Sequence, residues 1–167
     1  RFLATDKYHG LMIDFEDFPE KAQPGYRALL AELSADLHAK GMKLYVSVPP
    51  HNEDFDYAAV SAAADGVVVM NYDENTPDRE AGPVASQDWF TRNLGLAQKV
   101  IPRDKLICAI GNYGYDWAQK PKHGSLPPDV KNVNVSVQEA WLAARDSEED
   151  VDFDSDALNP HVSYLDE

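Results

Sequence analysis

Short apolar runs alternate with amphipathic stretches from the start of the chain to about residue 110. Apolar runs of four to eight residues bounded by polar ones are typical of buried strands in a parallel sheet. Here they cover residues 11–15, 43–48, 67–72 and 106–110. Because the stretches between them carry apolar residues at helical spacing, the order predicts β/α units, in which helices join parallel strands.

The clearest helix lies between the first two runs. Its apolar side chains recur three or four positions apart, from Tyr26 through Leu30 and Leu33 to Leu37. Gly41 follows and is a typical helix stop, since glycine adopts the backbone conformation that closes a helix. The pattern therefore predicts one amphipathic helix that ends shortly before Gly41.

Three further helices are predicted. One is the alanine-rich stretch 57–64, and another begins at Ser86. A fourth follows Ser136, because Glu139 three residues later completes a capping box, in which each side chain bonds the other residue's backbone N–H. Trp141 lies at helical spacing in this last helix, and we expect it in the core.

The alternation stops after the fourth run. Residues 112–135 are rich in Pro, Gly, Asn and Lys, which indicates irregular structure. An acidic stretch follows the last helix and continues to Pro160. We expect an irregular insertion at about residues 112–156, and then the start of one more strand at residues 161–165.

Composition excludes several classes of protein. The formal net charge of −14, from 15 Lys and Arg against 29 Asp and Glu, disfavours nucleic acid, which basic clusters bind. No run approaches the roughly 18 apolar residues of a membrane span. The single cysteine, Cys108, cannot form an internal disulfide. The first residues lack the order of a secretion signal, and we expect this sequence to be part of a longer chain.

Two acids follow the first apolar run. Residues two apart in a strand point to the same face, so Asp14 and Glu16 lie together on the face opposite Ile13. The carboxyl ends of parallel strands are where catalytic groups gather in α/β folds. Two neighbouring carboxyls resist joint ionisation, which suits general acid chemistry. Polar residues leaving a strand of a very acidic protein would give the same pattern.

A second polar strand end follows the third apolar run. This strand delivers Tyr72, Asp73 and Glu74 to its carboxyl end, and Met70 shares a face with Tyr72. Polar groups of two strands are thus expected at one rim of the sheet. An ordinary core tyrosine would also fit the position of Tyr72.

Four motifs together resemble one enzyme family. The chain carries HGLMIDFE, MNYDEN, GPVASQDW and NYGYDW, in this order, between Gly10 and Trp117. They resemble the glycoside hydrolases of family 18, the chitinase-like fold, which carry DGxxxDxE on the fourth barrel strand and MxYD on the sixth. Bacterial cell-wall and spore-cortex members are the most similar, with DFENLP, MTYDEH, GPVA and LYGYDW.

The resemblance implies an α/β fold, the (β/α)8 TIM barrel, of which the chain would hold roughly strands 4 to 7 and the start of strand 8. Residues 1–167 would then be a partial catalytic domain with the insertion at about 112–156. By motif position, Glu16 resembles the general acid, Asp14 the residue that orients the substrate's acetamido group, and Tyr72 the donor to its carbonyl oxygen. Asp73 would support the site.

The substrate implied is a glycan that contains β-1,4-linked N-acetylglucosamine, such as chitin oligomers, peptidoglycan or a related polysaccharide. Cleavage in this family is retaining and substrate-assisted, because the acetamido oxygen itself attacks the anomeric carbon. The implied substrate-binding residues are Met70, Asn112, Tyr113, Asp116 and Trp117. The resemblance implies no cofactor.

Two positions depart from the family pattern. His9 and Met12 stand where the family usually has acidic or amide residues. Met12 cannot share a proton with Asp14. The departures motivate an alternative: a carbohydrate-binding module on the same fold that has lost turnover.

A different barrel lyase or a metal hydrolase using the same carboxylates is a more distant alternative. His51 beside Glu53 and Asp54 is the only hint of a metal site, and the remaining histidines lack paired spacing, so we predict no metal. The resemblance also implies a place in the cell envelope or outside the cell. Deacetylase or glycosyltransferase domains on the same polypeptide are possible partners.

Overall fold

The computed structural model describes residues 7–15, 19–52, 55–118 and 131–165. The chain forms two compact units. The first holds the described residues up to Asn71 and those from Arg92 to Ala109, and the second holds Tyr72–Thr91 and the described residues from Ile110 onward.

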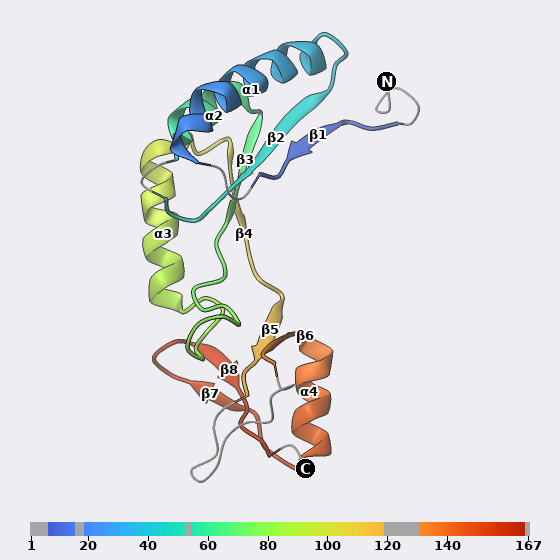
Figure 1. Ribbon diagram of the computed structural model, residues 1–167, viewed down its shortest axis with the longest axis vertical. Helices are drawn as coiled ribbons and strands as arrows, with labels where there is room; N and C mark the ends of the chain where they lie inside the picture. Colours follow the sequence, from blue (N-terminus) through green and yellow to red (C-terminus); the bar gives the residue numbers. More distant parts are fainter. Residues whose placement is uncertain (1–6, 16–18, 53–54, 119–130, 166–167) are drawn as a thin grey trace. The chain divides into compact units, whose positions relative to one another are not determined.

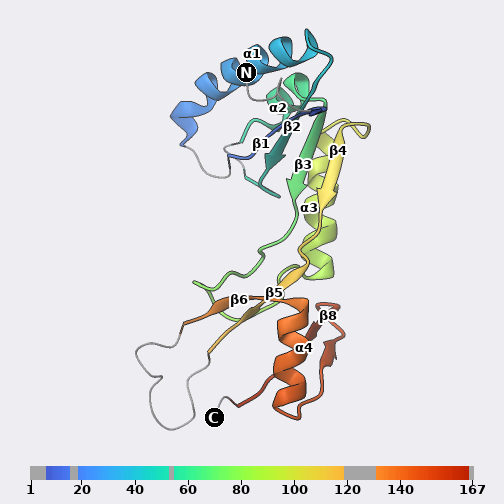
Figure 2. The same ribbon diagram turned by 90° about the vertical axis from the view of Figure 1, so that its right-hand side faces the viewer.

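A four-stranded parallel sheet forms the centre of the first unit (Figure 2). Its strands are β1 (Gly10–Ile13), β2 (Lys43–Val48), β3 (Gly66–Met70) and β4 (Leu106–Ala109), in the order β1-β2-β3-β4. The register places Ile13 opposite Val46, and Val46 opposite Val67. All four predicted strands are confirmed, although three of them end one or two residues earlier than the apolar runs suggested.

Helices connect the strands. They are the 3-10 helix η2 (Glu20–Ala22), α1 (Gln23–His38), α2 (Tyr57–Ala63) and α3 (Gln87–Val100). Figure 1 shows α1 and α2 lying together beside β2 and β3. Gly41 has a φ of +70°, a backbone conformation that disfavours other residues, so it turns the chain from α1 into β2 as predicted.

One face of the sheet makes the core. Five strand residues are fully buried: Leu44, Val46, Val48, Val67 and Val69. They pack against buried residues of the helices and the loop after α3: Leu30, Val60, Ala97 and Ile101. Each fully buried aliphatic side chain contributes about 1.5–3 kcal/mol, so this face is a main source of the stability of the unit.

The opposite face of the sheet is more open. Met12 is 52% exposed and Ile107 43% exposed, while Leu11 and Ile13 pack against the core. This alternation along β1 confirms that Met12 and Ile13 point to opposite faces, as strand geometry predicts.

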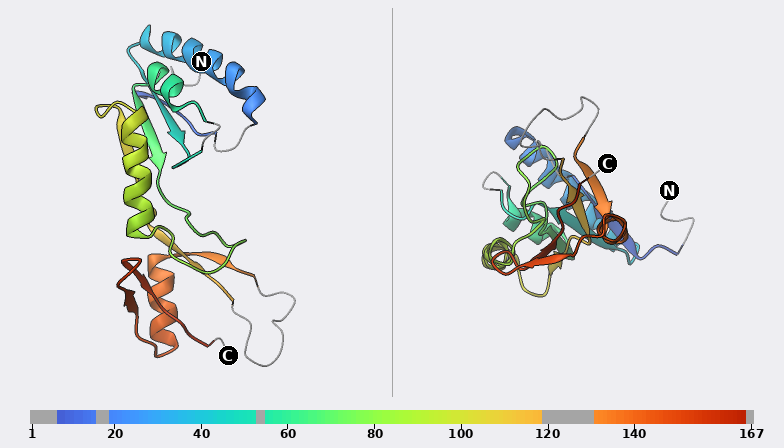
Figure 3. Two further views of the ribbon diagram at one scale, coloured as in Figure 1. Left: turned by 90° about the vertical axis from the view of Figure 1, so that its left-hand side faces the viewer. Right: turned by 90° about the horizontal axis from the view of Figure 1, so that it is seen from below.

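The second unit contains two short antiparallel ladders and one helix (Figure 3). The strands are β5 (Tyr113–Asp116) with β6 (Val133–Ser136), and β7 (Asp152–Asp154) with β8 (Asn159–His161). Helix α4 (Val137–Asp146) contacts β5 and β6. Its capping box is confirmed: Ser136 accepts from the Glu139 backbone N–H, and Glu139 from that of Ser136.

Three expectations for this part of the chain were wrong. The insertion is not irregular throughout, because β5 and β6 pair across it. The start of barrel strand 8 at residues 161–165 is also not found: His161 instead pairs antiparallel with Asp152. The reason is a turn closed by the Asp154 carboxylate, which accepts from the backbone N–H groups of Asp156 and Ala157 and reverses the chain. Trp141 is 60% exposed and not in the core.

No helix in the described ranges is long and apolar enough to cross a membrane.

Candidate functional site

In the first unit, Asp14 follows directly after β1 and is exposed. The hydroxyl of Ser47, a residue of β2 that is only 2% exposed, donates a hydrogen bond to Asp14 Oδ1. Ser47 Oγ also lies 3.1 Å from the main-chain oxygen of Ile13. Glu16, the predicted general acid, lies outside the described residues. Ser47 was not predicted as a site residue, although a serine between two valines of a predicted buried strand was a usable signal.

The charge of Asp14 also affects a tyrosine of helix α1. The pKa of Tyr26 is raised to about 12, chiefly because the phenol is buried and secondly because Asp14 is close. Both effects disfavour a phenolate. Tyr26 therefore stays neutral beside Asp14 across the ordinary pH range.

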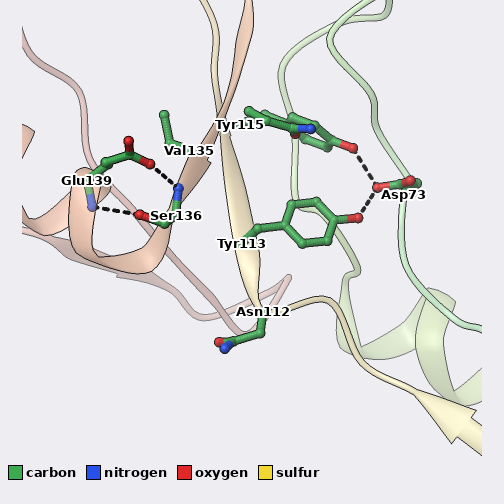
Figure 4. Close-up of a pocket in the computed structure, with 8 residues that line it drawn as sticks. Asp73, Asn112, Tyr113, Tyr115, Val135, Ser136 and Glu139 are labelled. Atoms are coloured by element: carbon green, nitrogen blue, oxygen red, sulfur yellow. Dashed lines mark hydrogen bonds between the residues drawn. The ribbon is translucent and has the colours of Figure 1, made fainter. Parts of the chain in front are cut away.

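In the second unit, Asp73 lies at the centre of a tyrosine cluster. Its Oδ1 accepts a hydrogen bond from the hydroxyl of Tyr113 and another, 2.6 Å long, from that of Tyr115. Figure 4 shows both hydroxyls pointing at Asp73. Asp73 has a φ of +68°, a left-handed conformation that aspartate tolerates better than most residues and that often marks functional sites.

The tyrosines extend this cluster into an aromatic row. Tyr72 packs edge to face on Tyr113 with ring centroids 6.0 Å apart, and Tyr113 packs in the same way on Tyr115 at 5.5 Å. Trp117 continues the row at 5.4 Å from Tyr115. Burial, and then the hydrogen bond to Asp73, raise the pKa of Tyr113 and bring that of Tyr115 to about 12. Both phenols are therefore neutral hydrogen-bond donors at neutral pH.

An open cavity of about 450 Å³ adjoins this cluster. Its walls mix two tyrosine rings with amides, a hydroxyl and two carboxylates, a composition that suits a polar ligand with apolar faces. The lining residues are Asp73, Asn112, Tyr113, Tyr115, Asn134, Val135, Ser136 and Glu139 (Figure 4). Of the predicted substrate-binding residues, Asn112 and Tyr113 line the cavity.

The remaining predicted site residues lie elsewhere. Met70 ends β3 and is half-buried. Asp116 accepts a hydrogen bond of 2.5 Å from the Tyr164 hydroxyl. The indole nitrogen of Trp117 is buried and has no hydrogen-bond partner within the described part of the chain. Neither Asp116 nor Trp117 lines the cavity.

The loop that carries Tyr72 and Asp73 is tied to the GPVAS stretch. The Glu74 carboxylate accepts from the Ser86 backbone N–H at 2.6 Å, and the Glu74 N–H donates to the Val84 oxygen at 2.8 Å. Asn75 donates to the Pro83 oxygen. A Cβ at Gly82 would lie 2.6 Å from the Asn75 amide nitrogen, so a larger residue there would displace the Asn75 side chain. The two motifs are thus one structural unit, a pairing that the sequence analysis did not foresee.

Metal binding has no support in the described ranges, where no group of three or more His, Cys, Asp or Glu side chains could hold an ion. His51 is described, but its neighbours Glu53 and Asp54 lie outside the described residues.

Comparisons with known proteins agree with the motifs. The model of the glycosyl hydrolases family 18 matches residues 1–160. The uncharacterized glycosylase YvbX of Bacillus subtilis is 34% identical over 143 residues, which are 80% of this chain and 38% of that protein.

Two solved structures share the fold. The chitinase from Chromobacterium violaceum ATCC 12472 superposes with a TM-score of 0.82 at 28% identity, covering 98% of this chain and 51% of that one. The Bacillus cereus spore cortex-lytic enzyme SleL superposes with a TM-score of 0.82 at 25% identity, covering 95% of this chain and 37% of that one. The chain thus spans between about two fifths and one half of these proteins.

Proposed function

Because the chain belongs to the glycosyl hydrolases of family 18, we propose that its protein is a glycosidase that cleaves glycans containing β-1,4-linked N-acetylglucosamine. The match over residues 1–160 carries this proposal. The similarity to a chitinase and to a spore cortex-lytic enzyme supports the substrate class. Chitin oligomers, peptidoglycan and related polysaccharides all contain the required sugar.

The proposed reaction is retaining and substrate-assisted. Glu16 protonates the glycosidic oxygen as the leaving sugar departs. The substrate's own acetamido oxygen attacks the anomeric carbon, while Asp14 orients the acetamido group and Tyr72 donates a hydrogen bond to its oxygen. The nucleophile is already attached to the sugar, so the protein's task is to orient it. This step needs no cofactor.

Asp73 has a supporting role in this scheme. Its carboxylate already accepts hydrogen bonds from Tyr113 and Tyr115, and the Tyr113 ring packs on Tyr72. These contacts hold the Tyr72 ring in place. The burial and charge that raise the pKa of Tyr115 to about 12 keep that donor protonated during turnover.

We assign glycan contacts to the cavity beside this cluster. Asn112 offers an amide and Tyr113 an aromatic ring, the two kinds of group that bind sugar hydroxyls and the apolar face of a pyranose. Met70 stays a predicted substrate-binding residue by its motif position, since it does not line this cavity. Asp116 and Trp117, which lie outside the cavity, contribute by shaping the segment that carries Tyr113 and Tyr115.

A chromogenic chitobioside tests the proposal with the full-length protein. We expect the native protein to release the chromophore, and Glu16→Gln to lower release by at least about a hundredfold, as loss of a general acid does. The matched control is Glu20→Gln, which changes an exposed acid in η2 and should keep full activity. Sugar binding without release by the native protein would favour the alternative, a carbohydrate-binding module that has lost turnover, which the departures at His9 and Met12 motivate.

The location of the protein is proposed from its family membership as well. We place it in the cell envelope or outside the cell, where N-acetylglucosamine polymers occur. Further domains, such as a deacetylase or a glycosyltransferase, stay a prediction.

A further inference from the structure

Ser47 is a buried polar residue whose two neighbours in the strand are apolar. It lies in β2 between Val46 and Val48, and all three residues are almost fully buried. The parallel register pairs Val46 with Ile13, so Ser47 lies beside Asp14. A buried hydroxyl has to be hydrogen-bonded, because leaving it unpaired costs free energy.

The Ser47 hydroxyl has two acceptors and one hydrogen. It donates to Asp14 Oδ1, and the main-chain oxygen of Ile13 lies 3.1 Å from the same Oγ. A hydroxyl rotates freely but donates to one strong acceptor at a time. If the Asp14 carboxylate turns away, Ser47 can therefore rotate to Ile13, and no buried donor is left unsatisfied.

Nothing else within the described ranges holds Asp14 as firmly. Among the described residues no ion pair to Asp14 is formed, and the bond from Ser47 is the one side-chain hydrogen bond to its carboxylate. Met12, two residues earlier on the same face, has no hydrogen-bond donor. Within the part of the chain that the structure describes, the orientation of Asp14 therefore depends mainly on Ser47.

We propose that Ser47 is a positioning residue for Asp14: its hydroxyl holds the carboxylate in one pose and, by rotating to the Ile13 oxygen, lets it leave that pose at little cost. The proposal rests on the proposed function, in which Asp14 orients the acetamido group. Ser47 acts through Asp14 and does not touch the sugar.

The test uses Ser47→Ala and Ser47→Thr in the full-length protein. Threonine keeps the hydroxyl and suits a strand, whereas alanine removes the hydroxyl with little change in packing. Ser61→Ala is the matched control, because Ser61 is also buried (3% exposed) but donates to the Tyr57 oxygen within α2. The measurements are kcat and KM on a chromogenic chitobioside, together with the thermal unfolding midpoint.

We expect Ser47→Ala to lower kcat roughly tenfold with KM nearly unchanged, Ser47→Thr to recover most of the loss, and Ser61→Ala to keep native kcat. The contrary result is that Ser47→Ala behaves as Ser61→Ala is expected to, with native kcat and a lower unfolding midpoint. In that case the hydroxyl is purely structural and the proposal is wrong.

Crystal structures of the native protein and Ser47→Ala separate this proposal from the proposed function. They should show Asp14 in one pose with Ser47 and in several without it. An Asp14 side chain that is unchanged in Ser47→Ala would overturn the proposal, whether or not the protein cleaves glycans.

Discussion

Asp73 and Tyr115 are joined by a hydrogen bond of 2.6 Å although 42 positions separate them in the chain. The contact links the residue after Tyr72 to β5, the strand that carries Tyr113 and Tyr115 of the aromatic row. It makes the MNYDEN and NYGYDW motifs parts of one cluster, so changes in one motif are expected to alter the other.

Removing one hydroxyl from this cluster should weaken it without unfolding the unit. We predict that Tyr115→Phe lowers turnover of a chitobioside roughly three- to tenfold, because Asp73 loses one of its two donors and the ring that Tyr72 packs on is held less firmly. Tyr57→Phe is the matched control, since it removes a hydroxyl that bonds the Pro49 oxygen and the Asn52 backbone N–H within the first unit. Equal effects of the two variants on turnover would argue against a special role for Asp73.

The same cluster predicts a change in tyrosine titration. Burial is the larger cause of the raised pKa of Tyr115, and the Asp73 charge and hydrogen bond add to it. Asp73→Asn should therefore lower the pKa of Tyr115 from about 12, and lower that of Tyr113 as well, without bringing either to the value of an exposed tyrosine. Nuclear magnetic resonance of ring-labelled tyrosine measures this directly. The chain has eight tyrosines, and only these two are expected to change. If the pKa of neither changes, Asp73 does not contribute to the raised values.

The hydrogen bonds of one carboxylate in the first unit, that of Asp65, predict how the stability of the protein depends on pH. Asp65 accepts from His38, Lys43 and the Leu44 backbone N–H, and these bonds outweigh its burial and lower its pKa. In the unfolded protein the pKa of this carboxyl is about 4, and in the folded protein it is lower. The stabilisation is therefore present above about pH 4 and is lost as the pH falls toward the folded-state pKa.

Asp65→Asn should accordingly lower the free energy of unfolding by about 1 kcal/mol at pH 7, with a difference that shrinks on acidification below about pH 4. Denaturant unfolding of the full-length protein across this pH range measures it. Asp36→Asn, an exposed change on α1, serves as the control. A difference that stays constant from pH 7 to pH 3 would contradict the assignment.

Lys105 is expected to stabilise the end of α2. Its ammonium donates to the main-chain oxygens of Ser61 at 2.7 Å and Ala64 at 2.8 Å, which are otherwise left open where the helix stops. Lys105→Met should cost about 1–2 kcal/mol of unfolding free energy in a denaturant titration. Lys99→Met, an exposed change on α3, should cost little, and an equal loss in both variants would refute the capping role.

Local patterns in the sequence were enough to predict the strands and helices of the first unit and the start of helix α4 in the second. Buried strands are continuous apolar runs, and Gly41 and the Ser136–Glu139 box mark helix ends through short-range chemistry. The ladder of β7 and β8 could not be predicted in this way. Its strands have three residues each, and a side-chain turn at Asp154, not apolar alternation, sets their pairing.

The site was predicted only in part, because its key contacts are long-range. The motifs marked Asp14 and Asp73, but neither periodicity nor spacing shows that Ser47 bonds the first or that Tyr115 bonds the second. Both partners come from neighbouring elements that only the fold brings close. The resemblance to family 18 did not supply them either, since they lie outside the residues to which it assigned roles.

The stereochemistry of the first product tests the central claim most directly. Nuclear magnetic resonance spectra recorded during cleavage of an N-acetylglucosamine hexamer by the full-length protein distinguish the two anomers before they interconvert. A retaining, substrate-assisted reaction predicts that the β anomer appears first and that a fully deacetylated hexamer is not cleaved. First appearance of the α anomer, or equal cleavage of the deacetylated hexamer, would contradict the account.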